Sequence, residues 1–383
     1  MTERERFVLQ AMEPDSNHSA LCRDFGITRS TGYKWLKRFR ERGLEGLRCL
    51  SRGPQPGKSP LRCNADVAVA VLRLRRDYPN YGPKKLRALL EREFPADAVP
   101  STRTVCRILE RAGLTRARKV RRRNSTAPSS APKVICEGPN DAWSVDFKGW
   151  WRMGNGQKAD PLTVQDRYSR YVLAVELVSA PSYDEVRAVF ERLFDRYGLP
   201  KAIQSDGGPP FAATSGVVGL SRLSAWWLAL GIEWHRSRPG CPQDNGGHER
   251  MHRDIADQLQ RRPAWNREQQ QDHCLRWLNE YNGHRPHEAI AMQVPADVYR
   301  RSRRLYTGEP PELVYPSGIV RRKVSKCGTS RYLGAQRYVS LAVGGYHVGF
   351  EPFGEASFRV WFANRVVAIG DIPWVSALRS PNA

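Results

Sequence analysis

The stretch AWSVDFKGWW, residues 142–151, tells more about the fold of this chain than any other segment. Its residues alternate as in a β-strand, with aromatic and aliphatic side chains on one face and Ser144, Asp146 and Lys148 on the other. An acid within an otherwise apolar strand loses hydration and needs a compensating partner. We therefore expect Asp146 to be either a paired core acid or part of a site.

The elements that follow this strand alternate between strand and helix patterns. We expect two strands around a turn at 161–178, a helix at 182–198, a strand at 201–206, a helical stretch near 216–231, a strand at 232–238, a long helix after the loop CPQDNGG and further helical structure near 266–303. This order predicts a mixed α/β sheet, and we assign the domain to residues 139–303.

The C-terminal part has a different pattern of short strands. Five of them, GIVRRKV, RYVSLAV, YHVGFEP, SFRVWFA and RVVAIGD, are separated by turns that contain Gly, Pro or Asn. Strands at this spacing predict a small β-barrel, of the SH3-like kind, over residues 313–373.

The N-terminal part reads as two all-α modules, residues 1–50 and 64–115. In the first, a helix near 18–25 is followed by a turn at Gly26 and a second helix capped by Thr28. This is the helix-turn-helix layout, although a plain helical hairpin gives the same pattern. We expect Tyr33, Leu36 and Phe39 to pack inward, and the DNA-facing residues of the second helix to be Arg29, Ser30, Lys34 and Lys37.

The second module repeats the pattern, with two helices separated at Pro79–Gly82 and a third helix capped by Ser101. A pair of such modules lengthens the DNA site that a single one can read. The apolar face of the third helix holds Val105, Ile108 and Leu109, so the outward-facing candidates for DNA contact are Thr102, Arg103, Thr104 and Arg107.

The chain is strongly basic, with a net charge of +23 and a pI of about 10.1. Residues 1–125 hold 29 Lys and Arg against 13 Asp and Glu, which favours a nucleic acid as partner. We expect residues 116–138 to be a basic linker that binds phosphates or, alternatively, a solvated charged tail. The basic residues that we expect to contact DNA lie in its first eight positions: Arg116, Arg118, Lys119, Arg121, Arg122 and Arg123.

Two other features bear on where the chain works. No apolar run of about 18 residues exists and the N-terminus lacks a signal-peptide pattern, so we expect a cytoplasmic protein without a membrane partner. The eight cysteines form no C-x-x-C pair, which favours reduced thiols over a structural zinc site.

Three acids of the α/β region are candidates for a shared site: Asp146, Asp206 at the end of a strand, and Glu249 near the start of a helix. Each also has a structural explanation, as a paired acid, a turn cap or a favourable first-turn charge. Carboxylates that converge repel one another unless a cation neutralises them, and oxygen ligands suit Mg²⁺ or Mn²⁺. Two such ions about 3.5–4 Å apart can clamp the attacking and leaving oxygens of a phosphodiester substitution.

The motifs WSVDF, SDGGPPF and PGCPQDNGGHERMH resemble the catalytic core of insertion-sequence transposases related to retroviral integrases. DRYSR at 166–170, YNGHRPHEAI at 281–290 and PADVY at 295–299 extend the resemblance, which runs from about residue 5 to 300. It implies an RNase H-like domain whose Asp-Asp-Glu triad, here Asp146, Asp206 and Glu249, is catalytic and binds two Mg²⁺ or Mn²⁺ ions.

The resemblance also implies roles for neighbouring residues. Asn245 would shape the loop before Glu249, while His252 and Arg253 would share its helical face and reach DNA phosphate. The sequence departs from the family at Gly207, where Asn is common, and at Gly246-Gly247, where a basic residue often precedes His-Glu.

These features lead to a DNA transposase as the first hypothesis. It would bind the terminal repeats of its element and cut and join DNA, with double-stranded element ends and target DNA as partners. Because two ends must meet, we expect at least a homodimer on DNA. The alternatives are a DNA-binding regulator with an inactive catalytic fold and a hydrolytic nuclease of RNase H type.

Overall fold

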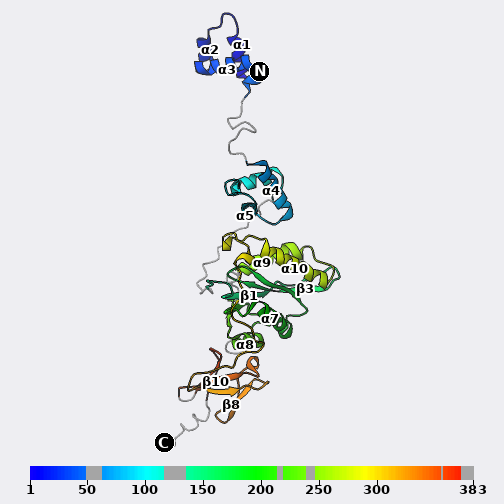
Figure 1. The fold of residues 1–383 in the computed structure, drawn as a ribbon. Coiled ribbons are helices and arrows are strands. Elements are labelled where there is room, and N and C mark those ends of the chain that lie inside the picture. Colours follow the sequence, from blue (N-terminus) through cyan, green and yellow to red (C-terminus); the bar gives the residue numbers. More distant parts are fainter. Residues whose placement is uncertain (49–62, 116–134, 214–218, 239–245, 355–356, 372–383) are drawn as a thin grey trace. The chain divides into compact units, whose positions relative to one another are not determined.

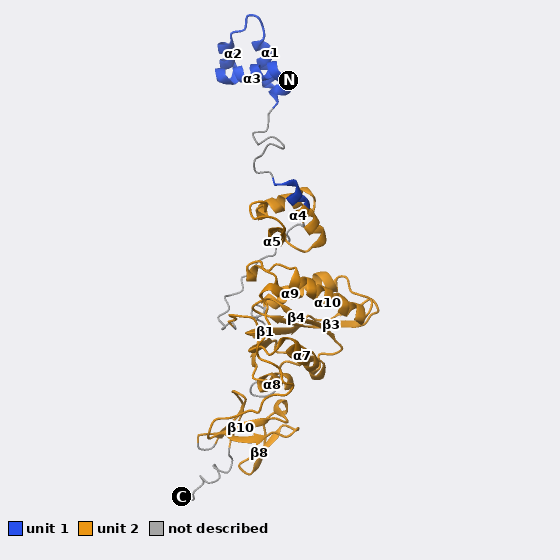
Figure 2. Cartoon of the chain, viewed as in Figure 1, with its two compact units in different colours: residues 1–69 blue, residues 70–383 orange. Residues whose placement is uncertain are grey.

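The structure is a computed structural model of the 383-residue chain (Figure 1). It describes residues 1–48, 63–115, 135–213, 219–238, 246–354 and 357–371. The chain divides into two compact units, residues 1–69 and 70–383 (Figure 2). Among the described helices, none has both the length and the apolar character that crossing a bilayer requires.

The first helical module contains the predicted turn between two helices. Its helices are α1 (Glu3–Ala11), α2 (His18–Asp24) and α3 (Arg29–Arg42), followed by a short 3-10 helix at Gly43–Leu47. Gly26 takes a φ of 62° in the turn, and the Thr28 hydroxyl accepts a hydrogen bond from the backbone N–H of Thr31. This capping starts α3 where the sequence predicts it.

The inward face of α3 differs in one position from the prediction. Leu36 is buried and Phe39 packs against the same cluster, but Tyr33 is 61% exposed and stacks on His18. Its place inside is taken by Gly32, where an added Cβ would lie 2.8 Å from both Cys22 Sγ and Phe7 Cζ. The helix therefore approaches its neighbours through a glycine, and the tyrosine beside it turns outward.

The second module has the three predicted helices, α4 (Ala65–Asp77), α5 (Pro83–Glu93) and α6 (Thr102–Arg111). Pro83 occupies the first turn of α5, where its missing N–H costs nothing. The Ser101 hydroxyl accepts from the N–H of Thr104 and caps α6, and Val105 and Leu109 are buried. The predicted cap and apolar residues thus lie at the start and on the buried face of α6.

The catalytic-domain candidate is built on one mixed sheet. Its strands are β1 (Ala142–Phe147), β2 (Trp151–Arg152), β3 (Lys158–Asp166), β4 (Val172–Val178), β5 (Ala202–Ser205) and β6 (Glu233–Arg236). In space they run β4-β3-β1-β5-β6, with the short β2 also paired to β3. The pairs β1–β3 and β3–β4 are antiparallel, whereas β1–β5 and β5–β6 are parallel. This is the RNase H-like arrangement that the resemblance implied.

Helices cover both faces of this sheet (Figure 1). On one face, α7 (Tyr183–Tyr197) and α8 (Arg222–Ala229) share a core with Trp143 and Val145 of β1. On the other, α9 (Gly246–Ile255) and α10 (Arg267–Gly283) pack against Val172 and Val175 of β4. The alternation of β1 therefore directs Ser144 and Asp146 to the face that α9 covers.

Structure near 266–303 is less helical than expected. After Gly283 only a 3-10 turn at Glu288–Ile290 and the four-residue α11 (Pro295–Val298) are helical. Pro286 follows α10 closely, and proline disfavours helix in the residue before it.

The small C-terminal barrel is not confirmed. The strands there are β7 (Val320–Lys323), β8 (Thr329–Tyr332), β9 (Ala335–Tyr338), β10 (His347–Phe353), β11 (Ser357–Phe362) and β12 (Arg365–Asp371). They form an open four-stranded sheet, β12-β11-β10-β7, and a separate β8–β9 hairpin. Within the described residues, β7 pairs along one edge only, with β10, so nothing closes the sheet on itself. The predicted strand RYVSLAV is split between β9 and a 3-10 turn at Leu341–Val343.

Candidate active site

Asp146 lies near the end of β1, on the face toward α9. Its Cα partner across the antiparallel pair is Thr163 of β3. On the other side β1 runs parallel to β5 with Ser144 opposite Gln204, and continuing that register by two residues sets Asp206 beside Asp146. The sheet thus places two of the three predicted acids at one edge, at the carboxyl ends of neighbouring parallel strands.

The electrostatics show that the third acid is close as well. The pKa of Asp146 is raised to about 7, mainly by burial and in addition by the nearby charges of Asp206 and Glu249. Lys148 acts in the opposite direction and lowers this pKa. Asp206 and Glu249 are themselves exposed, and Asp206 Oδ1 accepts from the N–H of Gly208 at 3.3 Å. Two exposed carboxylates therefore act on a third, half-buried carboxyl that holds its proton unusually well.

A buried histidine ties α9 to the sheet beneath these acids. His248 is 1% exposed, with Nδ1 2.8 Å from the Ser144 hydroxyl and Nε2 2.7 Å from the Thr163 hydroxyl. Burial lowers the pKa of His248 well below its usual value, so the ring is neutral at physiological pH. Both ring nitrogens are occupied, which makes His248 a structural link between helix and sheet.

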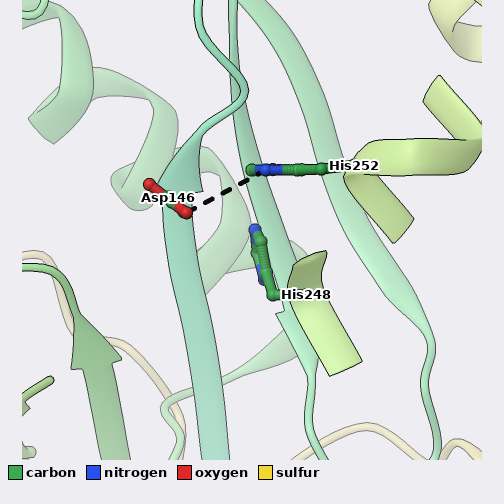
Figure 3. A group of neighbouring side chains, drawn as sticks. All are labelled: Asp146, His248 and His252. Carbon is green, nitrogen blue, oxygen red and sulfur yellow. Dashed lines mark ion pairs between the residues drawn. The ribbon is translucent and has the colours of Figure 1, made fainter. Parts of the chain in front are cut away.

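His252 lies one turn further along α9 and points toward the same place (Figure 3). Its Nε2 is 2.8 Å from the Thr163 hydroxyl and its Nδ1 is 4.0 Å from Asp146 Oδ2. Burial lowers the pKa of His252 to about 3. Ligand atoms of Asp146, His248 and His252 all lie within 4.8 Å of one another.

This position corrects the expectation that His252 shares the face of Glu249 and reaches DNA. A residue four positions on is rotated by only about 40° around a helix, whereas one three positions on is rotated by about 60° the other way. His252 therefore follows His248 toward the sheet, with its side chain 13% exposed. Arg253, four positions after Glu249, is exposed as expected.

The two glycine departures from the family pattern have a common structural consequence. An added Cβ at Gly207 would lie 2.7 Å from the Nε of Arg236, and one at Gly247 would collide with the guanidinium of Arg170. Gly207 therefore allows Arg236 to lie against the backbone next to Asp206, and Gly247 allows Arg170 to lie against the backbone before Glu249. Gly246 and Gly247 belong to α9 itself, so they form its first turn.

The remaining predicted DNA-contact residues differ in their exposure. Arg29, Ser30, Lys34 and Lys37 are exposed on α3, and Arg103 and Arg107 are exposed on α6. Thr102 and Thr104 are half-buried, and the Thr104 hydroxyl lies 3.2 Å from that of Ser101 at the helix cap. Several predictions fall outside the described residues: Asn245, Arg116, Arg118, Lys119, Arg121, Arg122 and Arg123.

Sequence reasoning missed His248, Thr163 and Ser144 as parts of this site. The usable signal was HERMH at 248–252, two histidines four residues apart on one helical face. In a zinc hydrolase of the H-E-x-x-H kind both histidines bind the metal. Here both nitrogens of His248 are engaged by Ser144 and Thr163, which argues against that use.

Comparison with known families agrees with the fold. The family described as "Integrase core domain" matches residues 137–242 and, through a second family of the same description, residues 230–295. A "Helix-turn-helix domain" matches residues 3–55 and a "Homeodomain-like domain" matches residues 31–109. The two matches in the first third of the chain support DNA binding there.

Relatives of the chain are proteins of bacterial insertion elements. It is 24% identical over 241 residues to the insertion element IS407 uncharacterized 31.7 kDa protein of Burkholderia multivorans, covering 63% of this chain and 83% of that protein. It is 25% identical over 238 residues to the IS476 uncharacterized 39.2 kDa protein of Xanthomonas euvesicatoria, covering 62% of this chain and 65% of that protein. These matches support a bacterial insertion-sequence transposase of the integrase superfamily.

A solved structure is also similar to part of the transposase. The HTLV-2 integrase catalytic core domain in complex with magnesium matches with a TM-score of 0.34 and 17% identity, covering 43% of this chain and 99% of that chain. In the transposase, the matched integrase core contains β1, β5 and α9, the three elements that carry Asp146, Asp206 and Glu249.

Proposed function

We propose that Asp146, Asp206 and Glu249 are the catalytic residues with which this transposase cuts the ends of its element and joins them to target DNA. The observation that carries the proposal is the gathering of these carboxylates, where two charges raise the pKa of the third. Repulsion between the carboxylates costs folding energy when no cation is bound, and groups with such shifted pKa values cluster at functional sites.

The donor set fits divalent cations. Three carboxylates at one sheet edge would offer hard oxygen ligands, the kind that Mg²⁺ and Mn²⁺ take, and the four positive charges of two ions would more than offset their three negative charges. When bound, the ions would supply Lewis-acid polarisation of phosphate oxygens and a more acidic attacking water or hydroxyl. Asp146 would bind an ion from within strand β1, whereas Asp206 and Glu249 would reach the ions from a loop and a helix.

The remaining parts would position DNA. The exposed side chains of α3 and α6 would bind the terminal inverted repeats, and the linker at 116–138 would add phosphate contacts. The strands of residues 313–373, in the role expected of an SH3-like barrel, would give a third DNA surface. Because two ends have to meet, the active form would be at least a homodimer on DNA, working in the cytoplasm.

Supercoiled donor DNA with the element ends, target DNA and Mg²⁺ tests the proposal. Strand joining by the purified chain supports a transposase, cleavage without joining a hydrolytic nuclease, and binding alone a regulator with an inactive fold. Removal of divalent metal with a chelator should abolish cleavage and leave binding to the ends unchanged.

A matched pair of variants tests the role of Glu249. Glu249→Gln should reduce cleavage and joining to background. Glu268→Gln changes another exposed first-turn glutamate, that of α10, and should keep full activity. Full activity of Glu249→Gln would show that the glutamate only favours the start of its helix and would remove it from the triad.

A further inference from the structure

The hydroxyl of Thr163 fixes how the two histidines of α9 share their protons. This hydroxyl donates to the backbone carbonyl of Asp146 at 2.8 Å, and a carbonyl oxygen can only accept. The single hydroxyl proton is thereby used. Nε2 of His248 and Nε2 of His252, at 2.7 and 2.8 Å, must then both be N–H donors to the Thr163 oxygen.

The tautomers that follow leave the Nδ1 atoms as acceptors. The Ser144 hydroxyl lies 2.8 Å from His248 Nδ1 and 3.3 Å from the backbone carbonyl of Gln165, and its one proton serves the shorter contact, so His248 Nδ1 has a partner. For His252 the Nδ1 lone pair faces Asp146 Oδ2 at 4.0 Å. An imidazole lone pair and a carboxylate oxygen do not bond to each other without a proton or a cation between them.

The spacing suits a shared metal ion. Two ligand atoms that are each about 2.1 Å from one ion lie up to about 4.2 Å apart, which the 4.0 Å separation meets. The ring is also pre-oriented, because the N–H to Thr163 fixes its direction as a ring N–H hydrogen bond does for metal-ligating histidines. His252 thus resembles a prepared nitrogen ligand beside Asp146.

We propose that His252 Nδ1 is a ligand of the metal ion that Asp146 binds, so that one of the two ions has a mixed nitrogen and oxygen shell. The proposal rests on the proposed function, since it adds a ligand to the same site. Imidazole suits transition metals better than Mg²⁺, so this site should prefer Mn²⁺ to Mg²⁺ more strongly than carboxylates alone would.

Electron spin echo spectroscopy of the full chain loaded with Mn²⁺ tests this ligand directly, without measuring activity. The wild-type spectrum should show modulation by a histidine nitrogen, which changes when the protein contains isotopically labelled histidine. His252→Asn should lose the modulation, and His273→Asn, which changes a histidine of α10 outside the cluster, should keep it.

Binding titrations give a second measurement. Loss of a group that only orients a ligand typically costs about 10–100-fold in metal affinity, so His252→Asn should weaken Mn²⁺ binding by at least about tenfold. Binding of Mg²⁺ should weaken by a smaller factor, which distinguishes a lost ligand from a disturbed fold.

The outcomes separate this proposal from the one on which it rests. If Mn²⁺ binds and Asp146→Asn abolishes binding, but no histidine nitrogen is seen, the acidic site stands and the role of His252 is overturned. If Asp146→Asn leaves Mn²⁺ binding unchanged, both proposals fail. Equal weakening of Mn²⁺ and Mg²⁺ by His252→Asn, with the nitrogen signal intact, also overturns the ligand.

Discussion

Helices α3 and α9 are both rich in basic and polar residues, but of the two only α9 buries an ionisable side chain. Helix α3 turns Leu36 and Gly32 inward and leaves Lys34 and Lys37 in solvent. Helix α9 buries His248 together with Met251 and Ile255. Hydrophobic periodicity identifies the buried face of a helix only where that face is apolar. It therefore identified Leu36 of α3, but it gave no sign that His248 of α9 is buried.

The largest effect should come from the apolar face of α3. Leu36 is 6% exposed, so Leu36→Ala should destabilise the first module by about 2–5 kcal/mol. Tyr33→Ala, three residues earlier and on the exposed side, should cost less than about 1 kcal/mol. Hydrogen exchange of the α1–α3 amides in the full chain measures both. Equal losses would mean that Tyr33 packs inward after all.

The carboxyl of Asp146, on the face of the sheet that α9 covers, should make the stability of the metal-free chain depend on pH. The pKa of Asp146 is raised to about 7 in the folded chain, so the folded state keeps its proton longer than an unfolded chain does. Stability should then fall as pH rises from about 4 to about 7. Asp146→Asn removes this dependence and should stabilise the chain at pH 8 by on the order of 2 kcal/mol.

The same experiment contains its own control. At pH about 4 the wild-type carboxyl is protonated in the folded state and about half protonated in the unfolded chain, so the advantage of Asp146→Asn should fall to a small part of its value at pH 8. Thermal melting with a chelator present, at both pH values, decides the matter. A constant difference between variant and wild type would show that shape, not charge, is responsible.

Gly32 of α3 and Gly246 of α9 differ in how closely neighbouring residues approach them. Gly32→Ala forces a Cβ against Cys22 and Phe7 and should cost about 1–3 kcal/mol. At Gly246, in the first turn of α9, the added Cβ meets no atom within 4 Å. Gly246→Ala should therefore gain up to about 0.5–1 kcal/mol by reducing the freedom of the unfolded chain. Thermal melting of the two variants should show shifts of opposite sign.

The smallest effect concerns the outward face of α3. Lys34 is exposed there, and a lysine that binds one phosphate contributes about 0.9 to the salt slope of DNA binding. Lys34→Ala should reduce that slope by about this amount, with little change in preference among DNA sequences. Binding titrations at several salt concentrations measure it, and an unchanged slope would place α3 away from the backbone.

Much of the fold follows from local signals in the sequence. Thr28 and Ser101 mark the starts of α3 and α6 because their hydroxyls cap orphan N–H groups, and the alternation around Asp146 marks β1. The C-terminal region was harder, because closure of a barrel depends on whether distant strands pair. The sequence of a four-residue strand such as β7 does not indicate which other strand it pairs with.

The site was only partly predictable for a similar reason. Motif spacing and strand ends led to Asp146, Asp206 and Glu249, because carboxylates at such positions are typical of metal and phosphate sites. Thr163 carried no such signal, since a threonine in a strand is ordinary. Its importance comes from lying opposite Asp146 and beneath both histidines of α9.

The order of helices and strands, the basic character of the N-terminal third and the choice of the three acids follow from local patterns in the amino-acid sequence. These depend on composition, caps and periodicity, which act within a few residues. In contrast, no local pattern indicates that His252 turns toward Asp146 or that the C-terminal sheet is open. Both depend on which segments, more than a hundred residues apart or at the two ends of a sheet, meet in space and bond.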